Sequence, residues 1–408
     1  MWSKDLALVL AAVACLFLNY PVLLIVGPVA FGEAGGAAGA AGLMTALFSG
    51  ATVCAELLSP GLLVSAAPGR VLVVALGAMS LGTLASTAAV DNASALLALA
   101  SVRGVGFGAA VVAMSVLVTE LAPPRRRGAA LGWLGLTTSL PSMFGPALGL
   151  ALLGGVGAAG VFAMSGLASL IGMGLAGAVR QPNVVPLAQS GSVWRGLRRR
   201  DMLFPFGALV LLSAGYGGFI SYAALALPGG AGVAPTLFLA YGVARTLGRW
   251  AAGSGSDRFG ARPLALGGTV AAVAALVLLA EAATAPEVGA ALFVAGALFG
   301  AGHGLASGAL QVGMLDQNDP ADVRLGSTLW NAGVDAGVSI GGAGLALVAS
   351  RYSLEAVFWG LPLFAGASLV VLAASWIRPP LPTVQTRPTD AAFVSNPGRA
   401  PSGPESDD

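Results

Sequence analysis

The sequence predicts an all-α membrane protein in which twelve transmembrane helices form two similar six-helix bundles. Three observations predict this fold: an apolar composition, twelve long apolar runs and an internal repeat. Hydrophobic residues make up 56% of the 408 positions and charged residues only 9%, whereas soluble domains are about a quarter charged. Too few polar residues are present to cover a particle of this size in water, so a bilayer is the expected solvent.

Twelve apolar runs are long enough to cross a bilayer, since a hydrocarbon core of about 30 Å requires about 20 helical residues. The runs lie at about 6–31, 41–66, 70–90, 94–121, 128–153, 158–179, 203–227, 233–255, 263–282, 287–315, 324–349 and 354–377. We therefore divide the chain into a first bundle at 1–180, a central loop at 181–202, a second bundle at 203–378 and a tail at 379–408. The tail is rich in Pro, Ser, Thr and Asp, which is typical of disorder.

Charges between the runs indicate the orientation. Arginines lie in the even-numbered connections and after the last run, and Lys4 precedes the first run, whereas the odd-numbered connections carry acids, apart from Arg351. The positive-inside rule then places both termini, the central loop and the tail in the cytoplasm. Nineteen arginines against a single lysine, Lys4, suggest a GC-rich bacterial genome, so we expect a bacterial inner membrane. The acids of the odd-numbered connections are Glu33, Asp91, Glu281 and Glu287.

An internal repeat appears when the sequence is shifted by 196 residues. The shift superimposes Tyr20 on Tyr216, and it superimposes a glycine triplet in the run 94–121 on one in the run 287–315. Because each half holds an even number of spans, both copies enter the membrane in the same sense. They form a parallel repeat whose two bundles can rock around a central cavity. The triplets are Gly104, Gly106 and Gly108, and Gly300, Gly302 and Gly304.

Three segments carry a resemblance to a known family. The connection between the runs 233–255 and 263–282 reads Gly253-Ser-Gly-Ser-Asp257-Arg258-Phe-Gly260-Ala-Arg262. It resembles the loop motif of the major facilitator superfamily, G-x-L-x-D-R-x-G-R, and the resemblance implies a gating role for these residues. The run 94–121 contains Arg103-Gly-Val-Gly-Phe-Gly-Ala-Ala, which is similar to the superfamily's R-x-x-Q-G-x-G-A-A, with Arg103 at the glutamine position. The resemblance covers about residues 4–378.

The run 128–153 ends in Pro141-Ser-Met-Phe-Gly145-Pro146-Ala-Leu-Gly149-Leu. This segment resembles G-x-x-x-G-P-x-x-G-G, a pattern of superfamily exporters that exchange drugs for protons; Pro141 and Leu150 replace its first and last glycines. The resemblance implies export, a monomer, and a cavity lined by the first, fourth, seventh and tenth helices.

Four ionisable residues lie deep within predicted spans, where charge is costly and marks a functional site by default. At 1.5 Å per residue, Arg103, Arg245, Glu56 and Asp335 lie about 14 to 18 Å from an end of their runs. The resemblance places Arg103 in the cavity as a substrate or counter-ion residue. An arginine paired with an acid to hold helices together would give the same pattern.

Further candidates for substrate binding are the only histidine, His303, and Tyr20, Tyr216 and Asn19. His303 titrates near neutral pH when it is solvated, but a packed neutral histidine is an equally good interpretation. The tyrosines offer rings for stacking and hydroxyls for hydrogen bonds, although packing alone also explains them.

Glu56 and Asp335 are the candidates for proton coupling. They lie in the second and eleventh runs, which the resemblance pairs at the interface between halves. A carboxylate removed from water there binds a proton readily, as a proton carrier must. Alternatively, each acid forms a structural contact with Arg245, Arg103 or Asn331.

The sequence therefore predicts a secondary transporter that exports a small organic molecule by proton antiport. An importer or uniporter of a small organic anion, clamped by Arg103 and Arg245, is the alternative, and a membrane sensor or scaffold is a more remote one. The expected partners are the substrate, protons and lipid. Nothing indicates an enzyme, a nucleic-acid partner, a cofactor or a metal site, since there is no phosphate-binding loop and no cluster of His and Cys.

Overall fold

The computed structural model describes residues 3–123, 126–180, 193–227, 229–285, 288–315 and 320–377. Within these ranges the chain is almost entirely α-helical and contains no strand. The predicted tail at 379–408 and residues 181–192 of the central loop lie outside the described residues. The helices are α1 (Lys4–Glu33), α2 (Gly42–Ser65), α3 (Pro68–Thr87), α4 (Ala93–Leu121), α5 (Arg127–Gly177), α6 (Val193–Leu197), α7 (Arg200–Ala226), α8 (Gly230–Phe259), α9 (Ala261–Ala283), α10 (Ala290–Leu315), α11 (Pro320–Arg351) and α12 (Leu354–Ile377), with a 3-10 turn, η1 (Ala38–Ala40), before α2.

These helices account for the twelve predicted spans. Ten helices of the described part are long and apolar enough to cross a membrane. One of them, α5, has 51 residues, about 75 Å as a straight helix and more than twice the hydrocarbon thickness. Its backbone turns at Gly157 (φ 67°, ψ 176°), between the two helices predicted at 128–153 and 158–179. The 30-residue α8 completes the twelve; buried arginines lower its hydropathy.

Local sequence explains where several helices begin. At the start of α1, the Ser3 hydroxyl accepts a hydrogen bond from the Leu6 N–H at 3.2 Å. Asn92 caps α4 in the same way by accepting from the Ala95 N–H at 3.0 Å. Both caps satisfy an N–H group that the first turn leaves without a partner. Pro68 begins α3, where the missing N–H of proline costs nothing.

The start of α7 differs from the predicted start of its span, because the helix begins at Arg200 rather than at residue 203. Asp201 lies in its first turn, where a carboxylate is stabilised by the positive end of the helix dipole. Arg199 precedes the helix and pairs with Asp201 at 2.7 Å and with Asp322 of α11 at 2.5 Å. These hydrogen bonds raise the pKa of the Arg199 guanidinium above its ordinary value.

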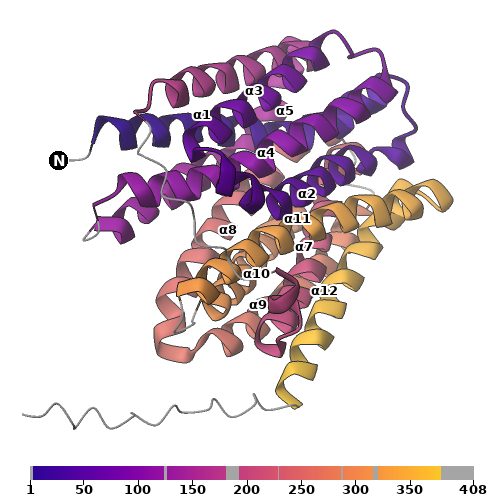
Figure 1. The fold of residues 1–408 in the computed structure, drawn as a ribbon. Coiled ribbons are helices and arrows are strands. Elements are labelled where there is room, and N and C mark those ends of the chain that lie inside the picture. The colour runs from indigo at the N-terminus through magenta and orange to yellow at the C-terminus, as the bar shows by residue number, and fades with distance from the viewer. Residues whose placement is uncertain are drawn as a thin grey trace, which may run out of the picture.

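The two bundles repeat the same arrangement of helices, as the internal repeat predicts. Helices α1–α5 form the upper bundle in Figure 1, and α7–α12 form the lower one. In the first bundle α1 packs on α5, while α4 packs on α2 and α3. In the second bundle α7 packs on α11 and α12, while α10 packs on α8 and α9. The prediction of two six-helix bundles is therefore confirmed.

The repeated glycines bring paired helices into close contact. Gly104 and Gly108 of α4 lie against the backbone carbonyls of Phe48 and Thr52 of α2, and a Cβ atom at either glycine would overlap them. Small residues permit such close approach between membrane helices. The second bundle reproduces the contact between α10 and α8 at Gly300 against Tyr241 and at Gly304 against Arg245.

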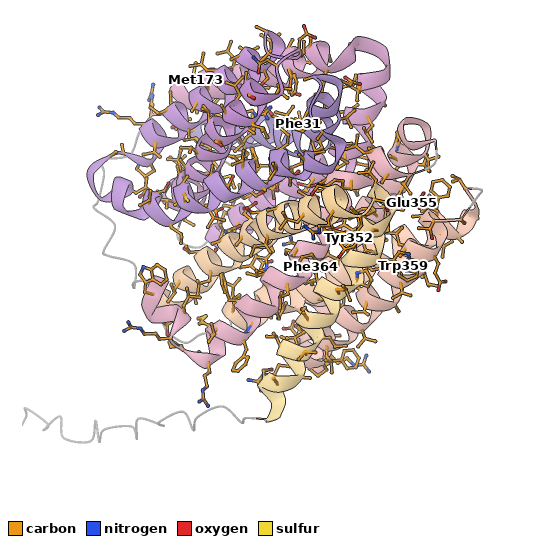
Figure 2. All side chains as sticks on the ribbon, turned by 90° about the vertical axis from the view of Figure 1, so that its right-hand side faces the viewer. Phe31, Met173, Tyr352, Glu355, Trp359 and Phe364 are labelled. Carbon is orange, nitrogen blue, oxygen red and sulfur yellow. The ribbon has the colours of Figure 1, made fainter. Side chains whose placement is uncertain are left out.

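The bundles meet mainly along two helix pairs, α2 with α11 and the first part of α5 with α8. The outward faces are apolar: Val74, Leu347 and Leu363 are each more than 70% exposed, as expected of side chains that contact lipid. Tyr352 in the turn between α11 and α12 and Trp359 of α12 are exposed, and both lie on the face that Figure 2 turns toward the viewer. These residue types are enriched where a membrane meets water.

We expect Gly104→Ala to destabilise the first bundle, because the added methyl group overlaps the Phe48 carbonyl. Overpacking of this kind costs about 1–3 kcal/mol. The matched control is Gly174→Ala on α5, where no atom lies within 4 Å of the added carbon. The thermal stability of the detergent-solubilised protein, followed by size-exclusion chromatography, measures the difference. Equal stability of the two variants would contradict the contact.

Candidate functional site

A cavity of about 1470 Å³ lies between the two bundles. Four helices of each bundle line it: α1, α2, α4 and α5 from the first, and α7, α8, α10 and α11 from the second. A volume of this size accommodates a small organic molecule with its hydration water. The cavity therefore lies where two bundles moving relative to each other would open and close it.

The cavity reaches one end of the helices. Its lining includes Glu120 in the last turn of α4, Leu131 near the start of α5, Leu315 at the end of α10 and Val323 near the start of α11. Because successive spans run in opposite directions, these positions lie at the same end as the start of α1. We call this end the mouth.

The opposite end is closed by contacts between the bundles. The Tyr222 hydroxyl of α7 donates to the carbonyl of Gly39 at 2.7 Å and accepts from the N–H of Gly42 at 3.1 Å. Gly42 also lies directly against the backbone of Gly342 of α11. We call this set of contacts the seal.

Two further hydrogen bonds extend the seal along α2. The hydroxyls of Thr45 and Ser221 lie 2.9 Å apart, and the Ser339 hydroxyl of α11 donates to the carbonyl of Ala46 at 2.8 Å. All the groups involved are small and uncharged. A seal of this kind holds the bundles together with little energy per contact, since a neutral hydrogen bond contributes only about 1 kcal/mol net.

Glu56 of α2 and Asp335 of α11 line the cavity together. Their side chains are buried, and the two carboxylates are close enough to interact electrostatically. Both oxygens of Glu56 and Oδ1 of Asp335 have no hydrogen-bond partner among the described residues. The helix pair that joins the bundles therefore carries an acid on each side.

Two arginines on α8, Arg245 and Arg249, line the same cavity. The guanidinium of Arg245 lies over the ring of Tyr216 at 5.4 Å, and that of Arg249 lies over Trp330 at 4.8 Å. Arg249 also donates to the side-chain oxygen of Gln311 at 2.9 Å. In the described part of the chain, no carboxylate lies within 4.0 Å of either guanidinium. The predicted structural ion pair of Arg245 with Glu56 or Asp335 is therefore not formed.

The repeat-related tyrosines line the cavity from opposite bundles. Tyr20 stacks on Phe107 with ring centroids 4.1 Å apart, and Tyr216 stacks on Tyr241 at 5.4 Å. Each tyrosine belongs to an aromatic cluster of its own bundle. The first aromatic cluster consists of Phe17, Tyr20, Phe48 and Phe107, and the second of Tyr216, Phe219, Tyr241, Phe299 and His303.

Comparison with known proteins assigns the family. Residues 8–253 and 229–401 match the model of the Major Facilitator Superfamily. The chain belongs to this superfamily. A crystal structure of the nucleoside transporter NupG aligns with a TM-score of 0.71 and 14% identity, over 92% of this chain and 99% of that one. A mutant of NupG aligns over the same shares with a TM-score of 0.69. A search of curated proteins found no match.

As a member of the superfamily, the chain is a membrane transporter.

Some residues that the sequence predicts to line the cavity lie outside it. His303 does not line the cavity. It packs behind Tyr216, with its Nδ1 atom 2.5 Å from the Tyr241 hydroxyl and its ring stacked on Phe299. It therefore belongs to the layer that supports the tyrosines.

Asn19 also lies outside the cavity lining, although its neighbour Tyr20 belongs to it. Its amide donates to the carbonyl of Ser165 at 2.9 Å and to the hydroxyl of Ser169 at 2.7 Å. These bonds tie α1 to the second part of α5. Adjacent residues on a helix point about 100° apart, so one lines the cavity while the other holds the bundle together.

Arg103 lies on α4, one helical turn from Phe107 toward the seal. Its side chain is 1% exposed and lines a separate small pocket with Phe48. The rings of Tyr20, Phe48 and Phe107 lie between that pocket and the cavity. The expectation that Arg103 lines the cavity is therefore corrected: a layer of aromatic rings separates the two.

Among the motif residues, Gly145, Pro146, Gly149 and the loop residues do not line the cavity, although Phe107, Ser142 and Met143 of the same segments do. Gly145 and Gly149 of α5 pack directly on α1, at Pro21 and Val22. With Pro146 they place α5 close to α1, so these residues belong to the packing interface between the two helices. The loop residues lie at the mouth end, where α8 ends and α9 begins at Gly260 (φ 81°), and they are solvent-exposed. They are Gly253, Asp257, Arg258, Gly260 and Arg262, and their gating role remains a prediction.

The short distance between Thr45 and Ser221 in the seal can be tested by disulfide cross-linking. In a background with Cys15 and Cys54 replaced by alanine, we expect Thr45→Cys with Ser221→Cys to form a disulfide under mild oxidation, because the two hydroxyls are in contact. The control pair is Leu131→Cys with Val323→Cys, on opposite walls of the mouth. Its cysteines should remain free. Cross-linking is measured by gel mobility after proteolysis between the bundles. A cross-link at the mouth but not at the seal would contradict the arrangement described here.

Proposed function

We propose that this protein is an alternating-access transporter that exports a small, partly apolar organic molecule in exchange for protons. The observation that carries the proposal is the pair of neighbouring buried carboxylates, Glu56 and Asp335, in the wall of the cavity between the bundles. No arginine lies within ion-pair distance of either acid among the described residues.

Two carboxylates in one poorly solvated site resist being ionised together, so the pair readily holds a proton. The same acids line the space that a substrate enters. A substrate that offers hydrogen-bond donors or positive charge to the pair competes with the proton for it. Competition for one site produces exchange, in which substrate binding from one side releases the proton and protonation from the other releases the substrate.

The pattern of arginines supports a direction. With both termini in the cytoplasm of a bacterial inner membrane, the mouth faces the cytoplasm and the seal faces outward. The substrate then enters from the cytoplasm, between the hydroxyl-rich wall of α4 and α5 and the arginine wall of α8. Breaking the small seal and closing the mouth would expose the acids to the outside. We expect one chain to suffice, because both bundles that form the cavity belong to it.

A specific observation favours a second candidate, the import of a small organic anion. Arg245 and Arg249 place two positive charges on one wall of the cavity, and no carboxylate lies within ion-pair distance of them in the described residues. Guanidinium groups bind carboxylates and phosphates well. Nucleosides are a further class to include, because the fold resembles that of a protein described as a nucleoside transporter and the tyrosines offer rings for stacking.

We expect Glu56→Gln and Asp335→Asn each to abolish proton-driven export, because each removes one acid of the pair while preserving its shape. Accumulation of a panel of dyes, antibiotics and nucleosides is measured in a bacterial host without its own efflux pumps, with and without a protonophore. The active protein lowers accumulation and the protonophore restores it. The control is Glu33→Gln, whose side chain is exposed outside the cavity, and it should export normally. Export that survives both acid substitutions would contradict the proposal.

The anion-import candidate is tested by uptake of labelled organic anions into the same cells. If it is correct, Arg245→Gln and Arg249→Gln each reduce uptake by about tenfold or more, since a charge-assisted contact contributes about 1.5–3 kcal/mol. Arg351→Gln, which changes an exposed arginine at the seal end of α11, serves as the matched control. The absence of any uptake would leave export as the function, and uptake that no arginine substitution affects would contradict the role given to the arginines.

A further inference from the structure

Arg103 is among the largest fully buried side chains of the protein. Its Nε and Nη1 atoms have no hydrogen-bond partner in the described part of the chain, and no carboxylate lies within 4.0 Å of it there. The guanidinium carbon lies over the ring of Phe162, 5.6 Å from the ring centroid. Removing a charged group from water costs several kcal/mol unless an opposite charge compensates it. A cation–π contact of this length supplies only a small part of that.

Arg103 lines a pocket of about 10 Å³. Five apolar residues of α1 and α2 and Thr45 complete its lining. This volume holds a single small species of about the size of a water molecule. A carboxylate or phosphate group does not fit, and a neutral water molecule leaves the charge of Arg103 uncompensated.

We propose that this pocket binds one monovalent halide ion, chloride in the cell, as the counter-ion of Arg103. Chloride is small and spherical, it accepts hydrogen bonds from a guanidinium and a hydroxyl at once, and it tolerates apolar neighbours. The site is distinct from the cavity, because the rings of Tyr20, Phe48 and Phe107 lie between them. The proposal does not depend on which substrate the cavity takes.

The position of the pocket couples the ion to the seal. Thr45 lines the pocket and is also in hydrogen-bonding contact with Ser221 of the second bundle. Separation of the bundles at the seal would break that contact and uncover the pocket on the seal side. The ion therefore enters and leaves from the seal side and is held while the seal is closed, so bound chloride stabilises the conformation with an open mouth.

The test measures the thermal stability of the purified full-length protein in sodium chloride and in sodium gluconate at equal concentration. We expect a melting temperature several degrees higher in chloride, and the same rise in bromide, because a ligand that binds only the folded state stabilises it. Arg103→Gln should abolish the difference. The matched control Arg351→Gln removes an exposed arginine and should preserve it. Equilibrium binding of labelled chloride should give about one ion per chain, with affinity reduced about tenfold or more in Arg103→Gln.

Two outcomes would overturn the proposal: equal stability of the unaltered protein in the two salts together with no bound chloride, or a chloride effect that persists in Arg103→Gln. If Arg103→Gln fails to fold, Thr45→Val replaces it, since valine has nearly the shape of threonine but lacks the hydroxyl that lines the pocket. That variant should bind chloride several-fold more weakly, and unchanged affinity would contradict the site. Loss of chloride binding with normal export would separate this proposal from the proposed function.

Discussion

The close approach of paired helices at their glycines is the constraint on which the site depends. In a bilayer no hydrophobic effect drives helices together, so packing and direct contact must hold each bundle. The backbone contacts at Gly104 and Gly304 fix α2 against α4 and α8 against α10. These partners carry Glu56 on α2 and Arg245 on α8. The rigidity of each bundle therefore sets the positions of the charged groups that face the cavity.

Contacts within a bundle differ in kind from contacts between the bundles. Within the first bundle, polar groups such as the amide of Asn19 bind two helices at once, here α3 through Thr83 and α5 through Ser165, deep among apolar side chains. Between the bundles, the seal consists of glycines and of neutral hydroxyls such as those of Tyr222 and Ser339. Strong contacts within each bundle and weak contacts between the bundles allow the two to move as rigid bodies, separating at one end and closing at the other.

Charge is distributed unevenly through the membrane region. The cavity holds two acids on the helices that join the bundles and two arginines on α8, each arginine stacked on an aromatic ring. A further charge, that of Arg103, lies beyond a layer of rings on the side of the seal. In a medium of low dielectric constant each of these groups needs a partner. The proton, the substrate and the small anion that we propose are partners that come from solution, so in this proposal binding and compensation of charge are the same event at these positions.

The sequence alone determined the number of spans, the two parallel bundles and the candidate functional residues. The reason is that the length of an apolar run and the presence of an ionisable residue within it can both be read from a single segment of the chain. It also predicted that Tyr20 and Tyr216 are equivalent and that Glu56 and Asp335 lie where the bundles meet. Only the tertiary structure decided which side of a helix each residue faces. Asn19 and Tyr20 are neighbours in sequence, yet one packs within the bundle and the other lines the cavity. Arg103 lies near the middle of its span, where a substrate-binding residue is expected, but three rings from α1, α2 and α4 separate it from the cavity. The spacing of residues along one helix cannot predict a contact that three helices make together. The sequence does not single out Arg249, because it lies near the end of its span. The packing of α8 on α10 places it beside Gln311, and its guanidinium lies over the ring of Trp330 of α11.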